Sequence, residues 1–397
     1  MNIVLFDTPQ ARKALRPFSY TRALAQLRVG IGTIAEKWQH HLQAPCSFLT
    51  APYLSEKFPC VAAPANWCID STICPDEALV AAIKRLEINQ QLVKDGILIA
   101  ACCDQATLQA LPTHNFQHPA LKTKAYERPL TQLNNNWDIF LLNAQELNKD
   151  FAWMSQGRST QRMSDPHTIT YNEAAIFLEE GVTTKAALLN AEAGPIYLGK
   201  NAQIREGAVI RGPVAIGEAA QISAHAVISN ATTVGPYAKV GGEVSNSVII
   251  GYSNKAHAGF MGHSVIGEWC NLGAGTTTSN LRNDYGPVKV GDAQQEAVAT
   301  TDLQFCGVFM GDHSKCGIHT MFNAGTVVGV SSNLFGAGYF DKFIPSFAWG
   351  EPGEPLQTYR LEKALETAEK MTSRRQVPFT EQDKKILSHI FLTTDRP

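Results

Sequence analysis

The residues of this chain whose types and spacing could do chemistry include two pairs of histidines. His257 and His263 are six residues apart, and so are His313 and His319. Paired imidazoles are common zinc ligands. The nine cysteines are the other soft ligands, but they are odd in number and scattered, with no CxxC pair. We expect reduced, mostly buried thiols rather than disulfides or a zinc site.

The element that carries the histidines has a strict six-residue period. An aliphatic side chain returns at Leu198, Ile204, Ile210, Ile216, Ile222, Ile228, Val234 and Val240, and a smaller register follows four residues after each, from Ala202 to Val244. This period fits neither an α-helix nor an alternating strand. It predicts a solenoid of short strands in which three six-residue faces form a triangular coil. Six residues move a side chain to the next face, so neither histidine pair shares a face within one chain.

The period resumes after an interruption. Met310, Cys316, Phe322, Val328 and Leu334 keep the same spacing, whereas residues 279–305 lose it and are polar. We expect this stretch to be a loop that leaves one coil, because insertions in solenoids collect on a binding face. The periodic residues alone predict six to seven coils.

The remaining sequence predicts two further parts. Residues 1–190 alternate apolar strand-like runs (NIVLFD, SFLTAPYL, NWCID, ILIAACC) with helical stretches (TIAEKWQHHL, DEALVAAIKRLEIN), which is typical of an α/β domain. Residues 152–172 are polar and predict a linker. The solenoid is expected over 191–345. Two helices are expected over 346–397 as a cap, the second opened by Thr380 and Asp383 in a capping-box pattern.

Composition excludes several classes of protein. The formal net charge of −2 on 397 residues indicates no surface for nucleic acid or anionic membranes. The first residues, MNIVLFDTP, have neither the basic region nor the apolar core of a signal peptide, and no run of about 18 apolar residues could span a membrane. We therefore expect a cytoplasmic protein.

The segment LRPFSYTRALAQLRVG near the amino terminus closely resembles an element of sugar-nucleotide pyrophosphorylases. Arg16, Pro17, Thr21, Arg22 and Gly30 fall where that family has them, although DTPQARK replaces its glycine-rich turn. The resemblance implies that a nucleoside triphosphate binds here and that cations stabilise charge on its α-phosphoryl group. The candidate cations are Arg12, Lys13, Arg16, Arg22 and Arg28. Asp70, at the end of the NWCID strand, is the candidate Mg²⁺ ligand, and Asp7 could serve the nucleotide.

The segment NKAHAGFMGHSVIGEWCNLGAGTTTSN resembles the acetyltransferase half of the bifunctional enzymes that make UDP-N-acetylglucosamine. The matching positions are His257, Phe260, Asn271, Ala274, Gly275, Thr276 and Asn280, and residues 323–326 (NAGT) resemble the later coenzyme A coil. The likeness runs through the whole chain in order, and it is greatest to the alternative form found in Bacteroidetes-type bacteria. It implies a left-handed parallel β-helix that forms a homotrimer, with acetyl-CoA bound between neighbouring subunits.

The resemblance also implies roles. His257 would be the general base that deprotonates the glucosamine amine, and the Ala274 N–H would bind the thioester oxyanion. Asn271 would orient the amine, and Phe260 and Asn280 would contact the sugar. Gly275, Asp312 and Ala324 are the other expected coenzyme contacts. A phosphate-binding lysine of the family aligns with Ser245, so Lys255, Lys289 or Arg282 would replace it.

The function implied is twofold: acetyl transfer from acetyl-CoA to glucosamine-1-phosphate, and Mg²⁺-dependent uridylyl transfer from UTP to N-acetylglucosamine-1-phosphate. Two alternatives stay open. One of the two domains could be a binding or assembly platform without activity, or the whole chain could be a trimeric scaffold.

Overall fold

A computed structural model of the chain describes residues 1–397 except 115, 117 and 292–298. Its internal contacts define two units. Unit 1 contains Met1–Leu15, Thr21–Leu27 and Gly32–Asn135, and unit 2 contains Arg16–Tyr20, Arg28–Ile31 and Asn136–Pro397. The predicted domain limits at residues 190 and 345 stay a prediction.

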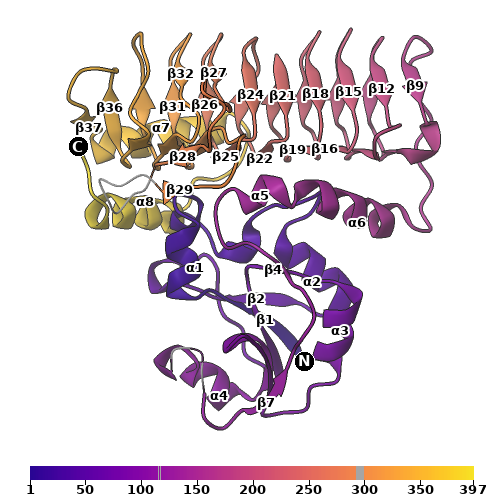
Figure 1. Ribbon diagram of the computed structural model, residues 1–397, viewed down its shortest axis with the longest axis vertical. Helices are drawn as coiled ribbons and strands as arrows, with labels where there is room; N and C mark the ends of the chain where they lie inside the picture. Colours follow the sequence, from indigo (N-terminus) through magenta and orange to yellow (C-terminus); the bar gives the residue numbers. More distant parts are fainter. Residues whose placement is uncertain (115, 117, 292–298) are drawn as a thin grey trace. The chain divides into compact units, whose positions relative to one another are not determined.

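Unit 1 is built on a mixed six-stranded sheet (Figure 1). Its order is β2 (Cys46–Leu49), β1 (Asn2–Phe6), β3 (Asn66–Asp70), β6 (Ile97–Cys103), β5 (Gln90–Lys94) and β7 (Lys122–Ala125). β1 pairs in parallel with both β2 and β3, whereas β6 is antiparallel to β3 and β5. The four predicted apolar runs all contribute strands. SFLTAPYL does so only through its first half, because a short 3₁₀ turn at Pro52–Leu54 follows.

Four helices pack within unit 1. They are α1 (Pro9–Ala14), α2 (Ile34–Leu42), α3 (Glu77–Lys84) and α4 (Gln105–Ala110), and a short antiparallel pair joins β4 (Ile73–Cys74) to β8 (Thr131–Gln132). α2 begins with a full capping box between Thr33 and Glu36, and its buried Trp38 donates from Nε1 to the Ile73 carbonyl at 2.8 Å. The predicted α/β domain is confirmed.

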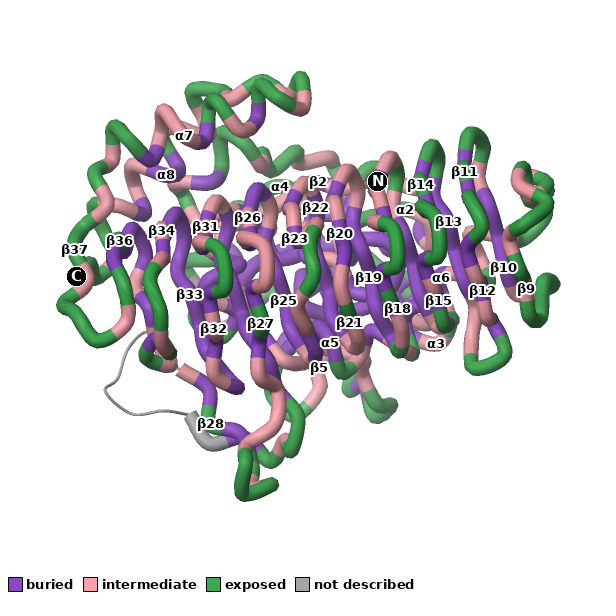
Figure 2. The backbone as a smooth tube through the Cα atoms, turned by 90° about the horizontal axis from the view of Figure 1, so that it is seen from above, coloured by how far each residue is buried: buried purple, intermediate pink, exposed green. Residues whose placement is uncertain are grey.

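Unit 2 is dominated by the predicted parallel β-helix, whose short strands form three faces (Figures 1 and 2). Face A contains β10 (Ile176–Leu178), β13 (Ile196–Leu198), β16 (Val214–Ile216), β19 (Thr232–Val234), β22 (Val248–Gly251), β25 (Val265–Glu268), β30 (Phe309–Met310), β33 (Val327–Val328) and β35 (Phe343–Ile344). Face B contains β11 (Thr183–Thr184), β14 (Gln203–Ile204), β17 (Gln221–Ile222), β20 (Lys239–Val240), β23 (Asn254–Lys255), β26 (Asn271–Leu272), β31 (Lys315–Cys316), β34 (Asn333–Leu334), β36 (Ala348–Gly350) and β37 (Gln357–Thr358). Face C contains β9 (Ile169–Tyr171), β12 (Leu188–Asn190), β15 (Val209–Arg211), β18 (Val227–Ser229), β21 (Glu243–Ser245) and β24 (Phe260–Gly262).

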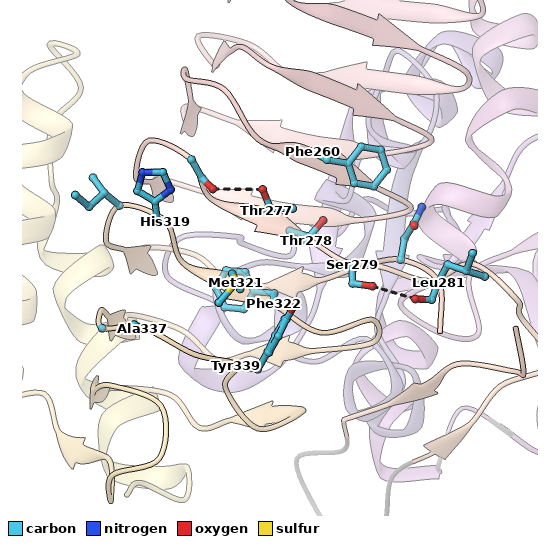
Figure 3. Close-up of a pocket in the computed structure, with 14 residues that line it drawn as sticks. Phe260, Thr277, Thr278, Ser279, Leu281, His319, Met321, Phe322, Ala337 and Tyr339 are labelled. Atoms are coloured by element: carbon cyan, nitrogen blue, oxygen red, sulfur yellow. Dashed lines mark hydrogen bonds between the residues drawn. The ribbon is translucent and has the colours of Figure 1, made fainter. Parts of the chain in front are cut away.

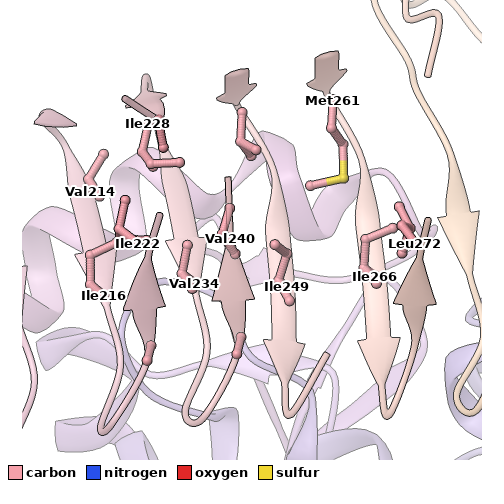
Figure 4. Close-up of a cluster of buried hydrophobic side chains, with 14 of the residues drawn as sticks. Val214, Ile216, Ile222, Ile228, Val234, Val240, Ile249, Met261, Ile266 and Leu272 are labelled. Carbon is pink, nitrogen blue, oxygen red and sulfur yellow. The ribbon is translucent and has the colours of Figure 1, made fainter. Parts of the chain in front are cut away.

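The two sequence registers form the core of the β-helix. Ile216, Ile222, Ile228, Val234 and Val240 stack along its interior (Figure 4), and the small register from Ala202 to Val244 is buried beside them. Each fully buried aliphatic side chain contributes about 1.5–3 kcal/mol. A stack of equivalent side chains in successive coils therefore supplies a continuous core, which is the reason for the strict period.

The predicted number of coils is wrong. The strands run from Ile169 to Gly350 and make about ten coils, so residues 169–172 belong to the β-helix and not to a linker. The first coils were missed because their corners are longer. Leu178 pairs with Leu198, twenty residues on, whereas Ile210 pairs with Ile228, eighteen residues on. Longer corners shift the registers without removing them from the core.

The predicted insertion leaves face C. β27 (Thr277–Thr278) pairs in parallel with β32 (Met321–Phe322), forty-four residues on, and the chain between them includes an antiparallel pair, β28 (Lys289–Val290) with β29 (Ala299–Thr300). The part of the predicted loop at 292–298 lies outside the described residues. The insertion is thus no coil of its own, as its lost period predicted.

Helices cover two faces within unit 2. Leu147 of α6 (Asn143–Ser155), which follows α5 (Asp138–Leu141), packs on Phe177, Tyr197 and Ala215 of face A. α7 (Leu361–Ser373) and α8 (Glu381–Thr393) lie along the late strands of face B (Figure 2), where Phe391 meets Phe347 edge to face at 5.0 Å. α8 opens with the predicted capping box of Thr380 and Asp383. Within the described chain, every helix is too short or too polar to cross a membrane.

Candidate functional site

The parallel strands of unit 1 bring polar side chains to one edge of the sheet. β1, β2 and β3 end there, and Asp7, Thr50 and Asp70 stand at their carboxyl ends. The fully buried Asp7 carboxylate accepts hydrogen bonds from Ser71 Oγ at 2.7 Å, Thr50 Oγ1 at 2.5 Å and Leu24 N at 3.1 Å. Open α/β sheets bind ligands at this edge.

Arg12 is the cation that the structure brings to this edge. Its Nη1 donates to Asp7 Oδ2 at 2.8 Å, to Thr50 Oγ1 at 3.1 Å and to the Arg22 carbonyl at 3.2 Å, and its Nη2 donates to the Tyr53 hydroxyl at 3.0 Å. Helix α1 carries Arg12 on its second turn, after Thr8 caps the helix. The guanidinium is therefore fixed in orientation before any ligand arrives.

The other predicted cations of this region are distributed differently. Lys13 is exposed on α1, whereas Arg22 is buried in unit 1. Arg16 and Arg28 are counted with unit 2. There the Arg16 guanidinium lies 5.2 Å from the centre of the Tyr20 ring, and Arg28 Nη1 donates to the Ile31 carbonyl. The resemblance implies that all five cations bind the same nucleotide, but only Arg12, Lys13 and Arg22 belong to unit 1.

Asp70 is buried at the end of β3, with 3% of its surface exposed. Its Oδ1 accepts from Thr72 N at 2.9 Å and Thr72 Oγ1 at 2.6 Å. Burial raises the pKa of Asp70 to about 6 and the charge of Asp7 adds to this rise, against the opposing effect of the Thr72 bonds. A carboxylate whose ionisation is disfavoured in this way is a suitable partner for a cation.

Replacing Asp70 by asparagine is therefore expected to stabilise the protein near neutral pH. The folded-state pKa lies above the ordinary value, so the contribution of Asp70 to stability is present below about pH 4 and is lost as the pH rises through about 6. Thermal unfolding measured from pH 4 to 7 should show that Asp70→Asn loses less stability than the wild type as the pH rises. The difference in the free energy of unfolding should be about 1–3 kcal/mol at pH 7. Added Mg²⁺ should raise the wild-type melting temperature more than that of the variant. Identical pH profiles would contradict the burial effect.

A cavity of about 960 Å³ opens on the β-helix where face C continues into β27 and β32 (Figure 3). Its lining consists of Phe260, Gly275, Thr277, Thr278, Ser279, Asn280, Leu281, Ile318, His319, Met321, Phe322, Gly336, Ala337 and Tyr339. The residues of this lining include no Asp, Glu, Lys or Arg, and His319 contributes its one imidazole. Aromatic and aliphatic side chains make up much of the wall.

The corner between faces B and C stacks three coils beside this cavity. Gly275 N donates to the Ala258 carbonyl at 3.1 Å, and His319 N donates to the Ala274 carbonyl at 2.7 Å. Gly259 must be glycine here, since its φ is +122° and a Cβ would lie 2.1 Å from the Thr276 carbonyl oxygen. The stacking places the GAGT coil directly against the coil that carries His257.

The predicted motif residues divide into two groups. Phe260, Gly275 and Asn280 line the cavity, whereas His257, Asn271 and Ala274 do not. His257 is exposed at the corner, and its imidazole makes no hydrogen bond among the described residues. Asn280 Nδ2 is 2.9 Å from His263 Nδ1, and burial lowers the pKa of His263, which favours its neutral form.

Asn271 lies on face B, around the corner from the cavity. Its Oδ1 accepts from Asn254 Nδ2 at 3.4 Å, and Asn254 Oδ1 accepts from Arg375 Nη2 at 2.8 Å. The carboxyl-terminal segment after α7 therefore reaches the candidate catalytic amide through one intervening side chain. This connection was not predicted, because nothing in the sequence indicates where the tail returns to the β-helix.

Several predicted ligand contacts are buried in the β-helix. Lys255 occupies a core register beside Val240, and its Nζ donates to the Gly241 carbonyl at 3.1 Å and the His257 carbonyl at 2.9 Å. Burial lowers the pKa of Lys255 to about 8, so this cation is not presented to a sugar phosphate. Asp312 is also buried and accepts from Glu268 N at 2.9 Å. Of the proposed replacement cations, Lys289 is exposed on β28.

Ala324, another predicted coenzyme contact, is likewise buried, and its carbonyl accepts a hydrogen bond from Lys342 Nζ.

The insertion explains why four residues of the cavity were not predicted from the sequence: Ile318, His319, Met321 and Tyr339. It shifts the sequence spacing so that Met321 stacks on Thr277, forty-four residues earlier instead of eighteen.

The described residues hold neither a metal-binding cluster nor a disulfide. In the described ranges no three His, Cys, Asp or Glu side chains come together as a metal site. The cysteines are free, and most are buried, with Cys60 exposed and Cys46 half-buried. Asp70 would thus need a nucleotide and water to complete the coordination of Mg²⁺.

Comparisons with known proteins find relatives of both kinds of transferase. Residues 3–159 match the family model described as sugar nucleotidyl transferase. The bifunctional protein GlmU of Methanocaldococcus jannaschii is 38% identical over 104 residues, which are 26% of this chain and 25% of that protein. A bifunctional sugar-1-phosphate nucleotidylyltransferase/acetyltransferase of Sulfurisphaera tokodaii is 35% identical over 144 residues, which are 36% of this chain and 35% of that protein. The chain thus spans only a quarter to about a third of these bifunctional relatives.

One shorter relative is matched over most of its own length. The uncharacterized acetyltransferase YaiX of Escherichia coli is 32% identical over 173 residues, which are 43% of this chain and 74% of that protein. The chain therefore contains a sugar nucleotidyltransferase domain and a β-helix of the acyltransferase kind, and it is a transferase.

Proposed function

The chain belongs to the family of the acetyltransferase YaiX, and we propose that it combines acetyl transfer with nucleotidyl transfer to make an N-acetylated sugar nucleotide. The β-helix would transfer the acetyl group of acetyl-CoA to the amine of glucosamine-1-phosphate. Unit 1 would then transfer a uridylyl group from UTP to N-acetylglucosamine-1-phosphate and release pyrophosphate. The name of the Sulfurisphaera tokodaii relative, which combines nucleotidylyltransferase and acetyltransferase, supports this pairing.

The observation that carries the proposal is the cavity beside the stacked corner. Phe260, Gly275 and Asn280 come from three separate stretches of one motif and line the same space. The Ala274 N–H donates no hydrogen bond to any residue of the described chain. It is therefore available to a developing oxyanion, and such donors are the largest electrostatic contribution to acyl transfer.

The chemistry at this corner requires one base. His257 takes a proton from the substrate amine while the amine nitrogen attacks the thioester carbonyl carbon. The tetrahedral intermediate collapses with cleavage of the carbon–sulfur bond, and coenzyme A leaves as the thiol after it accepts a proton. Because the His257 imidazole is exposed and makes no hydrogen bond to any described residue, it is accessible to a substrate that enters at the corner.

The edge of unit 1 would bind the nucleotide. Arg12 and Lys13 supply positive charge to the phosphates, and Asp70 is the carboxylate suited to Mg²⁺. When bound, the ion would neutralise charge on the phosphates. The residues of this chain orient the reaction: Asp7 and Thr50 hold the Arg12 guanidinium, and Thr72 holds one oxygen of Asp70.

A homotrimer is expected, built along the β-helix. Face C exposes apolar side chains, among them Ile169, Tyr171 and Val227, with Tyr339 exposed in the coil after β34. Exposed apolar side chains that recur along one face mark a contact surface. Light scattering at micromolar concentration should give a mass of three chains, about 130 kDa from 43.3 kDa each. A stable monomer would remove the shared acetyl-CoA site from the proposal.

A second candidate function is acetyl transfer alone. It is favoured by the state of Arg12, since Asp7, Thr50, Tyr53 and the Arg22 carbonyl already accept its hydrogen bonds. The turn DTPQARK also has no glycine to let a triphosphate approach the backbone. Pyrophosphate release from UTP, measured with a panel of sugar 1-phosphates and Mg²⁺, separates the two candidates. Release with none of them would favour this second function.

The experiment for the acetyltransferase is thiol release from acetyl-CoA. Glucosamine-1-phosphate should stimulate release, glucosamine without phosphate less so, and N-acetylglucosamine-1-phosphate should not, because its amine is already acylated. Release that no amino sugar stimulates would contradict the proposed acetyl transfer.

A further inference from the structure

Four cations gather on face B near the end of α7. Lys239 of β20 pairs in register with Asn254 of β23, and Arg375 donates from Nη2 to Asn254 Oδ1 at 2.8 Å. Arg374 precedes Arg375 in the chain, and Arg205 follows β14 on the same face. We call Arg205, Lys239, Arg374 and Arg375 the face B cluster.

The face B cluster has no acidic partner among the residues that the structure describes. Several other cations of unit 2 have an acidic partner: Lys363 and Lys370 of α7 bind Glu366 at 2.9 and 2.5 Å, and Lys185 lies 3.9 Å from Glu206. None of the four cluster cations makes an ion pair with an Asp or Glu within the described part of the chain.

The cations of the cluster also repel one another. Partial burial lowers the pKa of Lys239, and the charges of Arg375, Arg205 and Arg374 lower it further. Partial burial and the charge of Arg374 lower the pKa of Arg375. Four neighbouring positive charges without an acidic partner in the described ranges are unfavourable in the free protein, and an anion placed among them would relieve this repulsion.

We propose that the face B cluster, with the amides of Gln221 and Asn254 beside it, binds the diphosphate group of a nucleotide. Arginine forks favour phosphate oxygens, and four cations exceed what one monophosphate needs. Gln221 lies next to Lys239 on the same face.

The place of the cluster fits a ligand that ends at the acyl-transfer corner. Asn254 joins Arg375 to Asn271, and Lys239 is two coils from Asn271, which is about 10 Å at roughly 4.8 Å per coil. The interpretation that this ligand is coenzyme A, the acyl donor, rests on the proposed acetyl transfer. A diphosphate occurs both in coenzyme A and in a nucleotide sugar, so the experiment must distinguish these two sources.

The test is calorimetric titration of the full chain, without turnover, with coenzyme A, pantetheine and UDP-N-acetylglucosamine. The double variant Arg374→Ala/Arg375→Ala should bind the nucleotide that contacts the cluster about tenfold or more weakly than the wild type does. A higher salt concentration should also weaken the binding of this nucleotide to the wild type. Pantetheine, which has no phosphate, should bind the wild type and the variant alike. Lys370→Ala is the matched control on α7, because Lys370 is already bound to Glu366, and it should leave the affinity unchanged. Arg375→Lys should keep part of the affinity, since the charge remains.

The results separate this inference from the proposed function. Weaker binding of coenzyme A alone identifies the acyl donor, and weaker binding of the nucleotide sugar alone identifies that compound. The cluster stands in either case, even if the protein shows no acetyl transfer. Equal affinities of the wild type and the double variant for both nucleotides, with unchanged thermal unfolding, would overturn the inference.

Discussion

Replacing His257 by alanine should lower acetyl transfer by about 10²- to 10⁴-fold, because a positioned general base contributes that much. The effect should appear in the turnover number, measured as thiol release at saturating amino sugar. The dissociation constant for coenzyme A should change little, since the imidazole acts on the amine and not on the coenzyme. The expectation rests on the exposed position of His257 beside the GAGT coil.

The β-helix offers a matched control for this variant. His225 lies between β17 and β18, at the same corner of faces B and C as His257, and it too is exposed. His225→Ala should keep wild-type activity. His263→Ala is less suitable as a control than its sequence position suggests, because His263 contacts Asn280, which lines the cavity. Should His319→Ala abolish transfer while His257→Ala retains it, the base is the histidine inside the cavity.

Replacing Arg12 by alanine should lower the free energy of unfolding of unit 1 by about 3–5 kcal/mol. The Asp7 carboxylate is completely buried, and Arg12 is its charged partner at 2.8 Å. Removing the guanidinium leaves the buried Asp7 charge with hydrogen bonds from Ser71, Thr50 and Leu24 but without its cation. Urea unfolding should show the loss as a lower midpoint, and any nucleotidyl transfer should fall at least about 10²-fold as the cation at the sheet edge disappears.

Two further variants separate stability from catalysis at this edge. Asp7→Asn combined with Arg12→Ala removes both charges and should recover part of the lost stability, although not the activity. Lys13→Ala removes an exposed cation of the same helix and should change stability by less than about 0.5 kcal/mol. A midpoint for Arg12→Ala equal to that of Lys13→Ala would contradict the role given to the Asp7–Arg12 pair.

The β-helix was the part of the fold most accessible from the sequence. Each coil repeats the same contacts, so Ile210, Ile228 and Val244 occupy equivalent core positions at near-constant spacing. The first coils were hidden by corners of different length. The cavity was only half predicted for a similar reason: Phe260, Gly275 and Asn280 belong to one motif, whereas Met321 and Tyr339 reach it only because residues 279–305 leave the coil.

The cation sites were predicted least well. Lys255 was expected at a ligand because it is basic and close to the motif, but its position in the core register directs it inward. Arg16 and Arg28 belong to a recognisable element, yet their contacts are with unit 2. Arg374 and Arg375 carry no sequence signal at all, since their role depends on where α7 ends against face B. Long-range contacts of this kind are not encoded in local spacing.

The central claim, two transfer activities in one chain, is tested most directly by a single reaction with omissions. Purified protein is incubated with glucosamine-1-phosphate, acetyl-CoA, UTP and Mg²⁺, and the sugar products are identified by mass spectrometry. The full mixture should yield UDP-N-acetylglucosamine, omission of UTP should stop at N-acetylglucosamine-1-phosphate, and omission of acetyl-CoA should leave the amine unmodified. No acetylated sugar and no sugar nucleotide in the full mixture would contradict the account.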